Sequence, residues 1–138
     1  MKVFFDTNVY VAEALLGDAA TAMIAATEGA GWRIFVSDYV LDELVRVLAE
    51  YRHCAPRFAA RTRRHVLRRC HLVVPVPSKH QVPDDPKDSP ILAAAITASV
   101  DYLVSNDSHL LGLDPYEGVR IVAMSAYYDL LAHAGLLG

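Results

Sequence analysis

Short apolar runs alternate along the chain with longer segments in which apolar residues recur at helical spacing. The short runs predict strands at residues 2–5, 33–36, 72–74, 101–104 and 119–122. The longer segments predict helices at residues 9–16, 19–27, 58–70, 89–99, 108–111 and 125–133. A further helix is expected to start at Ser37 or Asp38, and Asp18 is the expected N-cap of the second helix.

The alternation of strands with helices determines the expected fold class. Parallel strands need long crossover connections, and a helix is the usual one, so the pattern predicts a parallel sheet with helices on both faces. No internal repeat, low-complexity segment or change of composition marks a linker within the 138 residues. We therefore expect one α/β domain over residues 1–138.

Composition excludes several classes of protein. With 54% apolar and 21% charged residues, the chain is neither disordered nor fibrous. Its 2 cysteines are too few for a disulfide framework, which favours a reducing compartment. The longest run without Asp, Glu, Lys or Arg is residues 89–100, whereas a membrane span needs about 20 residues. We expect a cytoplasmic protein without a membrane segment.

The net charge of −3 is unevenly distributed, because residues 52–69 form a basic segment, called the basic island below. Residues 52–69 contain no Asp or Glu but hold the arginines Arg52, Arg57, Arg61, Arg63, Arg64, Arg68 and Arg69. In the predicted helix the 4, 3, 4 spacing of Arg57, Arg61, Arg64 and Arg68 puts these four on one face. This face is a candidate for binding RNA phosphates or an acidic protein segment, because guanidinium groups pair with both phosphate and carboxylate. A solvated helix face is the alternative.

Four acidic residues stand at the borders of apolar elements. Asp6 and Asp107 each follow a predicted strand, Glu43 lies in the helix after Ser37, and Asp88 precedes the Ala-rich helix. Parallel sheets bind ligands at the carboxyl ends of their strands. Converging carboxylates repel one another unless a cation offsets their charge, and Mg²⁺ or Mn²⁺ prefers such oxygen ligands. A metal held there would activate water for attack on a phosphodiester.

Each acid also has a purely structural interpretation. Asp6 and Asp88 are good N-caps for the helices that follow them. Glu43 is compatible with a solvated acid in the first turn of its helix, favoured by the helix dipole. Taken one at a time, these structural interpretations are the stronger ones.

Taken together, the motifs resemble those of the PIN-domain family (PilT N-terminus-like). The resemblance rests on residues 6–8 (DTN), 41–44 (LDEL), 85–88 (DPKD) and 102–111 (YLVSNDSHLL), in register over essentially the whole chain. It implies a three-layer α/β/α sandwich with a parallel sheet of about five strands. It also implies a nuclease site in which Asp6, Glu43, Asp88 and Asp107 are catalytic and bind Mg²⁺ or Mn²⁺, with Asn8 and Ser105 as supporting polar residues.

The resemblance carries further expectations and two departures. Single-domain members are often VapC-type toxin ribonucleases, which are dimeric and neutralised by a small antitoxin protein. Many members have Gly before the fourth acid, where this chain has Asn106, a residue that tolerates the left-handed conformation of a tight turn. Some members carry a further acid after the last strand, where this chain has Met124 and Ser125.

The main hypothesis is therefore a metal-dependent endoribonuclease that hydrolyses RNA phosphodiester bonds, the toxin of a toxin–antitoxin pair. One alternative is a non-catalytic module of the same fold that binds RNA or a protein. Another is a DNA-directed nuclease, whose site would use similar carboxylates.

Overall fold

The computed structural model describes residues 1–76 and 89–137. Its strands are β1 (Lys2–Phe5), β2 (Arg33–Val36), β3 (His71–Leu72), β4 (Tyr102–Val104) and β5 (Arg120–Val122). Its helical elements are α1 (Thr7–Leu15), α2 (Asp18–Gly29), α3 (Asp38–Arg46), the π-helical turn η1 (Val47–Tyr51), α4 (Pro56–Arg69), α5 (Ser89–Thr97), α6 (Ser108–Leu111) and α7 (Met124–His133).

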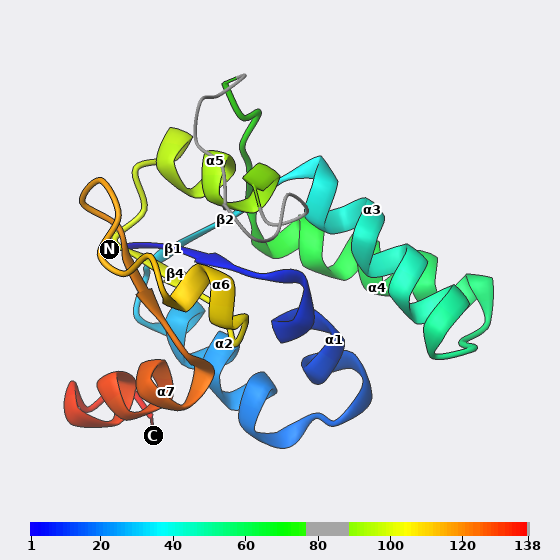
Figure 1. Ribbon diagram of the computed structural model, residues 1–138. Coiled ribbons are helices and arrows are strands. Elements are labelled where there is room, and N and C mark those ends of the chain that lie inside the picture. The colour runs from blue at the N-terminus through cyan, green and yellow to red at the C-terminus, as the bar shows by residue number, and fades with distance from the viewer. Residues whose placement is uncertain (77–88, 138) are drawn as a thin grey trace.

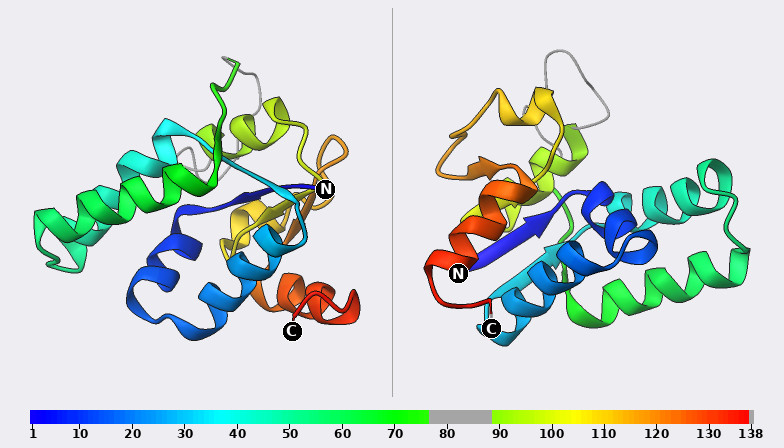
Figure 2. Two further views of the ribbon diagram at one scale, coloured as in Figure 1. Left: turned by 180° about the vertical axis from the view of Figure 1, so that it is seen from behind. Right: turned by 90° about the horizontal axis from the view of Figure 1, so that it is seen from below.

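The five strands form one parallel sheet in the order β3-β2-β1-β4-β5. Helices α1, α2 and α7 lie on one side of the sheet and α5 on the other (Figure 1). This is the expected three-layer α/β/α sandwich. Helices α3 and α4 pack side by side and project together from the sheet as an arm (Figure 2).

The central strand β1 explains why the core is continuous. Val3, Phe4 and Phe5 are all fully buried, because β1 is paired on both edges and covered on both faces. A strand in this position reads as an unbroken apolar run, unlike a strand with one face in water. The packing includes the Phe5 ring, which meets the rings of Tyr10 and Tyr127 edge-on.

The strand order indicates where on the sheet a ligand is expected to bind. From β1 the chain proceeds through β2 to β3 in one direction, and then returns to the other side of β1 for β4 and β5. The order therefore reverses between β1 and β4, and open parallel sheets bind their ligands at the carboxyl ends of strands at such a point. Asp6 follows β1 and Ser105 follows β4, so both stand at this position.

The structure corrects one local prediction and adds two local details. Gly17, at φ 84°, is the N-cap of α2, so Asp18 is the first residue of the helix and not its cap. Asn106 is not left-handed; instead its Oδ1 accepts the backbone N–H of Met124 at 2.9 Å. The helix after Ser37 changes to a π-helical turn after Arg46.

Within residues 1–76 and 89–137, no single helix is long and apolar enough to cross a membrane. The helix pair α1 and α2 passes the same test of length and composition only when taken together, and it is bent by 118°.

Candidate active site

Asp6 is held where β1 meets α1. Its backbone N–H donates to the carbonyl of Val104 on β4 at 3.0 Å, which continues the pairing of the two central strands. Its Oδ1 accepts the backbone N–H of Thr7 at 2.6 Å and so caps α1. The residue is only 5% exposed. The cap interpretation of Asp6 is thus confirmed, but it accounts for only one of the two carboxylate oxygens.

That other oxygen joins Asp6 to the end of β4. The hydroxyl of Ser105, which is fully buried, donates to Asp6 Oδ2 at 2.7 Å. The same hydroxyl oxygen accepts the backbone N–H of Asp107 at 3.0 Å. Asp107 Oδ1 in turn accepts the N–H groups of His109 and Leu110 at the start of α6. One hydroxyl therefore fixes the positions of two of the predicted acids.

Asp6, Glu43 and Asp107 form a crowded anionic site, called the acidic site below. Burial raises the pKa of the Asp6 carboxyl above its usual value of 3.8, because the charged form loses its hydration. The hydrogen bonds from Ser105 and Thr7 oppose that change, since both stabilise the carboxylate. The negative charges of Glu43 and Asp107 raise the pKa further, so both acids lie near enough to Asp6 to disfavour its ionisation.

Glu43 is contributed by helix α3. It lies in the middle of α3, not in the first turn, so its interpretation as a first-turn acid is wrong. Ser37 caps this helix by accepting the N–H of Val40, and α3 packs against α1, whose N-cap is Asp6. The Glu43 side chain is 21% exposed and stands 4.0 Å from the guanidinium of Arg46.

Two predicted site residues remain, Asn8 and Asp88. Asn8 is exposed on the first turn of α1, two residues after Asp6. Asp88 lies outside the described residues. Within residues 1–76 and 89–137, no three His, Cys, Asp or Glu side chains form a preassembled metal cluster.

The donor set nevertheless fits a hard divalent cation. Asp6 is a buried carboxylate with two other carboxylates near it, and a cation would offset the repulsion that raises its pKa. Mg²⁺ keeps several of its waters and uses only one or two protein carboxylates, so it does not require a closed cage of side chains. Asp6, Glu43 and Asp107 are therefore compatible with such an ion.

Thr7 adds a feature that sequence reasoning missed. Its hydroxyl oxygen is buried and has no hydrogen-bond partner in the described part of the chain, although the residue is only 1% exposed. A buried polar atom without a partner is costly, and such atoms are often found at functional sites. The sequence signal was present, since Thr7 directly follows Asp6, but only the structure reveals the burial.

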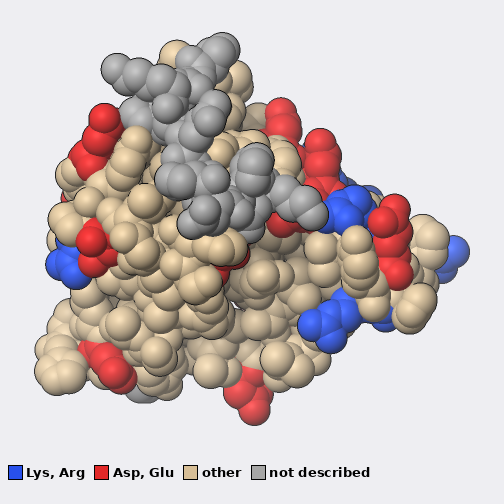
Figure 3. All heavy atoms as spheres, viewed as in Figure 1, with Lys and Arg blue, Asp and Glu red and all other residues tan. Residues whose placement is uncertain are grey.

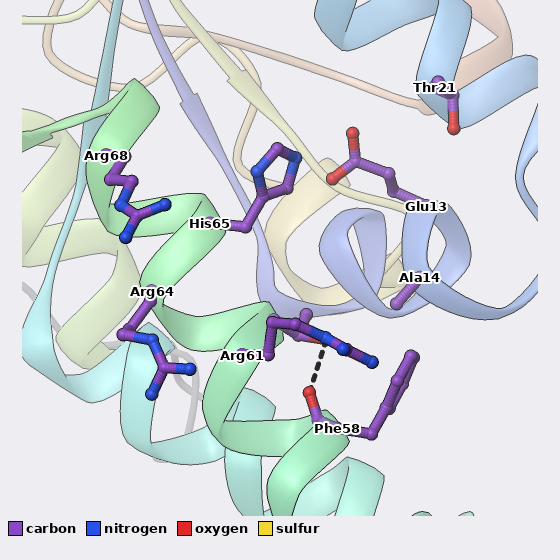
Figure 4. Close-up of a pocket in the computed structure, with 9 residues that line it drawn as sticks. Glu13, Ala14, Thr21, Phe58, Arg61, Arg64, His65 and Arg68 are labelled. Carbon is purple, nitrogen blue, oxygen red and sulfur yellow. Dashed lines mark hydrogen bonds between the residues drawn. The ribbon is translucent and has the colours of Figure 1, made fainter.

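The arginine face forms one wall of a groove. Helix α4 contributes Arg61, Arg64 and Arg68 to a cavity of about 610 Å³, whose opposite wall includes Glu13 of α1 and Thr21 of α2. In Figure 4, His65 and Glu13 point toward one another across the groove, while Arg64 and Arg68 lie along the α4 edge. Arg57 does not line this groove. Three of the four arginines predicted to share a face thus line one groove.

Other charges of the basic island are paired. Arg69 makes a two-pronged ion pair with Glu13, with both N–O distances at 2.6 Å. Arg63 stands 3.8 Å from Asp42 of α3. Most of the lysine and arginine atoms visible in Figure 3 gather on the side where the α3–α4 arm projects. Because Arg69 neutralises Glu13, the groove keeps a net positive lining.

Comparison with known proteins gives both a family and a fold. A family model described as "PIN domain" matches residues 2–109. The fold is similar to that of VapBC2 from Rickettsia felis, solved bound to a DNA fragment from its promoter. That match has a TM-score of 0.65 and 14% identity, covering 89% of this chain and 98% of the other.

A second solved structure has a similar fold. PAE2754 from Pyrobaculum aerophilum has a TM-score of 0.65 and 15% identity, covering 96% of this chain and 90% of the other. No curated protein sequence matches the chain. At these identities the two structures establish the fold alone.

Proposed function

The chain belongs to the PIN-domain family, and from that premise we propose that it is an endoribonuclease that hydrolyses RNA phosphodiester bonds with Mg²⁺ or Mn²⁺. The observation that carries the proposal is the hydrogen-bonded series Asp6–Ser105–Asp107 at the reversal of strand order. A series that served only to cap helices would not need a buried hydroxyl to join the two carboxylate-bearing loops.

In this proposal, Asp6, Glu43, Asp88 and Asp107 hold the cation. The bound ion supplies an activated water and offsets the negative charge that develops on phosphate oxygens. Ser105 orients Asp6 by donating to Oδ2, while Thr7 N–H fixes Oδ1. Asn8, exposed two residues after Asp6, would donate its amide N–H to water or phosphate.

The groove along α4 is proposed to hold the RNA backbone. Helix α1 links the groove to the acidic site, because Asp6 is its N-cap and Glu13 of the same helix lies in the groove wall. At 1.5 Å per residue, these two positions are about 10 Å apart along the helix axis. That span is short enough for one strand of RNA to contact both the arginines and the acids.

We further propose that the protein acts in the cytoplasm as a homodimeric toxin, neutralised by a small antitoxin. The proposal draws on the resemblance to VapC-type toxins and on the fold shared with the Rickettsia felis complex. An acidic segment of the antitoxin would compete with RNA for the arginine groove, since both are anionic.

Cleavage of end-labelled structured RNA tests the proposed activity. We expect cutting with Mn²⁺, none with EDTA, and none with Asp6→Asn. The matched control is Asp101→Asn. Asp101 directly precedes β4, at the amino-terminal end of the strands and so away from Asp6, and it accepts the backbone N–H of Lys2. Equal cutting by the wild-type protein and Asp6→Asn would contradict the assignment of Asp6.

Two other outcomes would replace the proposal. If the protein binds RNA without cutting any, it is a non-catalytic binding module. If it cuts DNA and leaves RNA intact, it is a DNA-directed nuclease. Duplex and single-stranded DNA of the same sequence therefore belong in the same assay.

A further inference from the structure

A second, smaller pocket lies beside Glu43 on helix α3. It has a volume of about 420 Å³ and is lined by Tyr39, Asp42, Glu43 and Arg46. Of these four described residues only Arg46 carries a positive charge. Glu43 therefore belongs both to this pocket and to the acidic site, and the guanidinium of Arg46 lies next to Glu43 in the pocket.

The Arg46 side chain is held from the π-helical turn that follows it. Its Nη1 donates to the hydroxyl of Tyr51 at 3.3 Å, and its guanidinium carbon lies 5.3 Å from the centre of the Tyr51 ring. Tyr51 is the last residue of η1, which directly follows Arg46. Short π-helical segments are rare and are frequently found at functional sites.

The carboxylates around Arg46 hold it only loosely. Glu43 and Glu50 each stand 4.0 Å from a guanidinium nitrogen, beyond hydrogen-bond distance, and the Arg46 side chain is 44% exposed. Exposed pairs of this kind contribute little free energy. The charge of Asp42 is offset by Arg63 at 3.8 Å. A ligand with a stronger anionic group can therefore replace these contacts at small cost.

We propose that Arg46 binds a phosphate of the RNA immediately beside the cleavage site, with Tyr39 forming an aromatic wall for the attached nucleotide. This inference rests on the proposed function, because it takes Glu43 to be engaged by the metal. The negative charge of Glu43 is then offset, and Arg46 presents its donors to the phosphate. A guanidinium is well suited to this role, since its planar set of N–H groups can donate to two phosphate oxygens.

RNA binding without cleavage provides the test. The assay uses fluorescence anisotropy with a fluorescein-labelled single-stranded RNA and the protein with Ca²⁺ in place of Mg²⁺, since Ca²⁺ also takes carboxylate oxygens as ligands. Gel electrophoresis checks that the RNA stays intact during the measurement. Arg46→Gln is expected to weaken binding about tenfold, the effect of losing one hydrogen-bonded ionic contact. The slope of log affinity against log salt should fall by about 0.7, the value for one phosphate contact on a single strand.

Two further variants separate this contact from a general effect of charge or folding. Arg46→Lys keeps the charge, so the salt slope should remain while part of the affinity is lost. Arg33→Gln removes an exposed arginine at the amino end of β2, the opposite edge of the sheet, and should change neither quantity. In the cleaving protein, Arg46→Gln should raise KM more than it lowers kcat, because the contact exists before the reaction.

The outcomes distinguish this inference from the proposed function. If RNA binds the Ca²⁺-loaded protein and Arg46→Gln leaves both affinity and salt slope unchanged, the inference is wrong while the nuclease assignment stands. A loss of affinity equal to that of Arg33→Gln would also overturn it. If the wild-type chain neither binds nor cuts RNA, the proposed function fails and this inference fails with it.

Discussion

The hydroxyl of Ser105 donates to the carboxylate of Asp6 at 2.7 Å, joining residues that are 99 positions apart in the sequence. Both side chains are buried, and they follow the two strands between which the order of the sheet reverses. The same hydroxyl accepts the N–H of Asp107. The positions of Asp6 and Asp107 thus depend on one serine, which itself would contact neither metal nor substrate in the proposed reaction.

Replacing Ser105 with alanine should therefore damage both stability and activity. The substitution removes a hydrogen bond from a buried carboxylate and leaves the Asp107 N–H without its acceptor, so we expect a loss of about 1–3 kcal/mol in the free energy of unfolding. Urea denaturation measures this loss. Ser125→Ala, at an exposed position on α7, should change stability by less than about 0.5 kcal/mol. Equal stabilities for the two variants would contradict the role given to Ser105.

The raised pKa of Asp6 predicts how stability depends on pH in the absence of metal. Because its folded pKa lies above the ordinary 3.8, Asp6 favours folding below that pH and loses this contribution as pH rises through the folded pKa. Asn cannot ionise and still caps a helix. Asp6→Asn should therefore gain stability relative to the wild-type protein as pH rises from 3.8 toward 7. Denaturation in EDTA at several pH values checks this, and a difference that does not vary with pH would refute it.

The arginine groove predicts a graded effect on RNA binding. Each of Arg61→Gln, Arg64→Gln and Arg68→Gln should lower the salt slope by about 0.7, the value for one phosphate contact. Arg57→Gln is the matched control, because Arg57 belongs to the same helix but does not line the groove. If all four variants bind RNA as the parent does, the groove is not the RNA path, and an acidic protein segment becomes its better occupant.

Two arginines of α4 should differ strongly in their contribution to stability. Arg69 and Glu13 are 11% and 14% exposed, and two 2.6 Å contacts join them. Arg69→Ala leaves Glu13 without its partner and should cost about 3 kcal/mol or more. Arg63→Ala breaks a single 3.8 Å contact to an exposed Asp42 and should cost at most about 1 kcal/mol. Thermal and urea unfolding measure both, and the reverse order would show that burial does not decide the difference.

Local patterns in the sequence determine most of the elements. Strands β1 and β2 and helix α6 have the predicted bounds, and the other predicted elements agree to within a few residues at their ends. These predictions succeed because apolar periodicity, caps and turn residues act over a few neighbouring positions. The position of Asp6 directly after a strand was likewise readable from the chain, whereas Asp107 lies three residues beyond the end of β4.

Only the tertiary structure determines how segments far apart in the sequence meet. The Ser105–Asp6 bond, the approach of Glu43 to Asp6 and the pairing of Arg69 with Glu13 all depend on the order of strands and the packing of α1 against its neighbours. The sequence placed Arg57, Arg61, Arg64 and Arg68 on one helix face, but only α1 and α2 determine which of them line a groove. The π-helical turn after Arg46 also has no clear local signal. The reason is physical: periodicity tells which face of an element is buried, whereas the partner of that face is determined by packing across the whole domain.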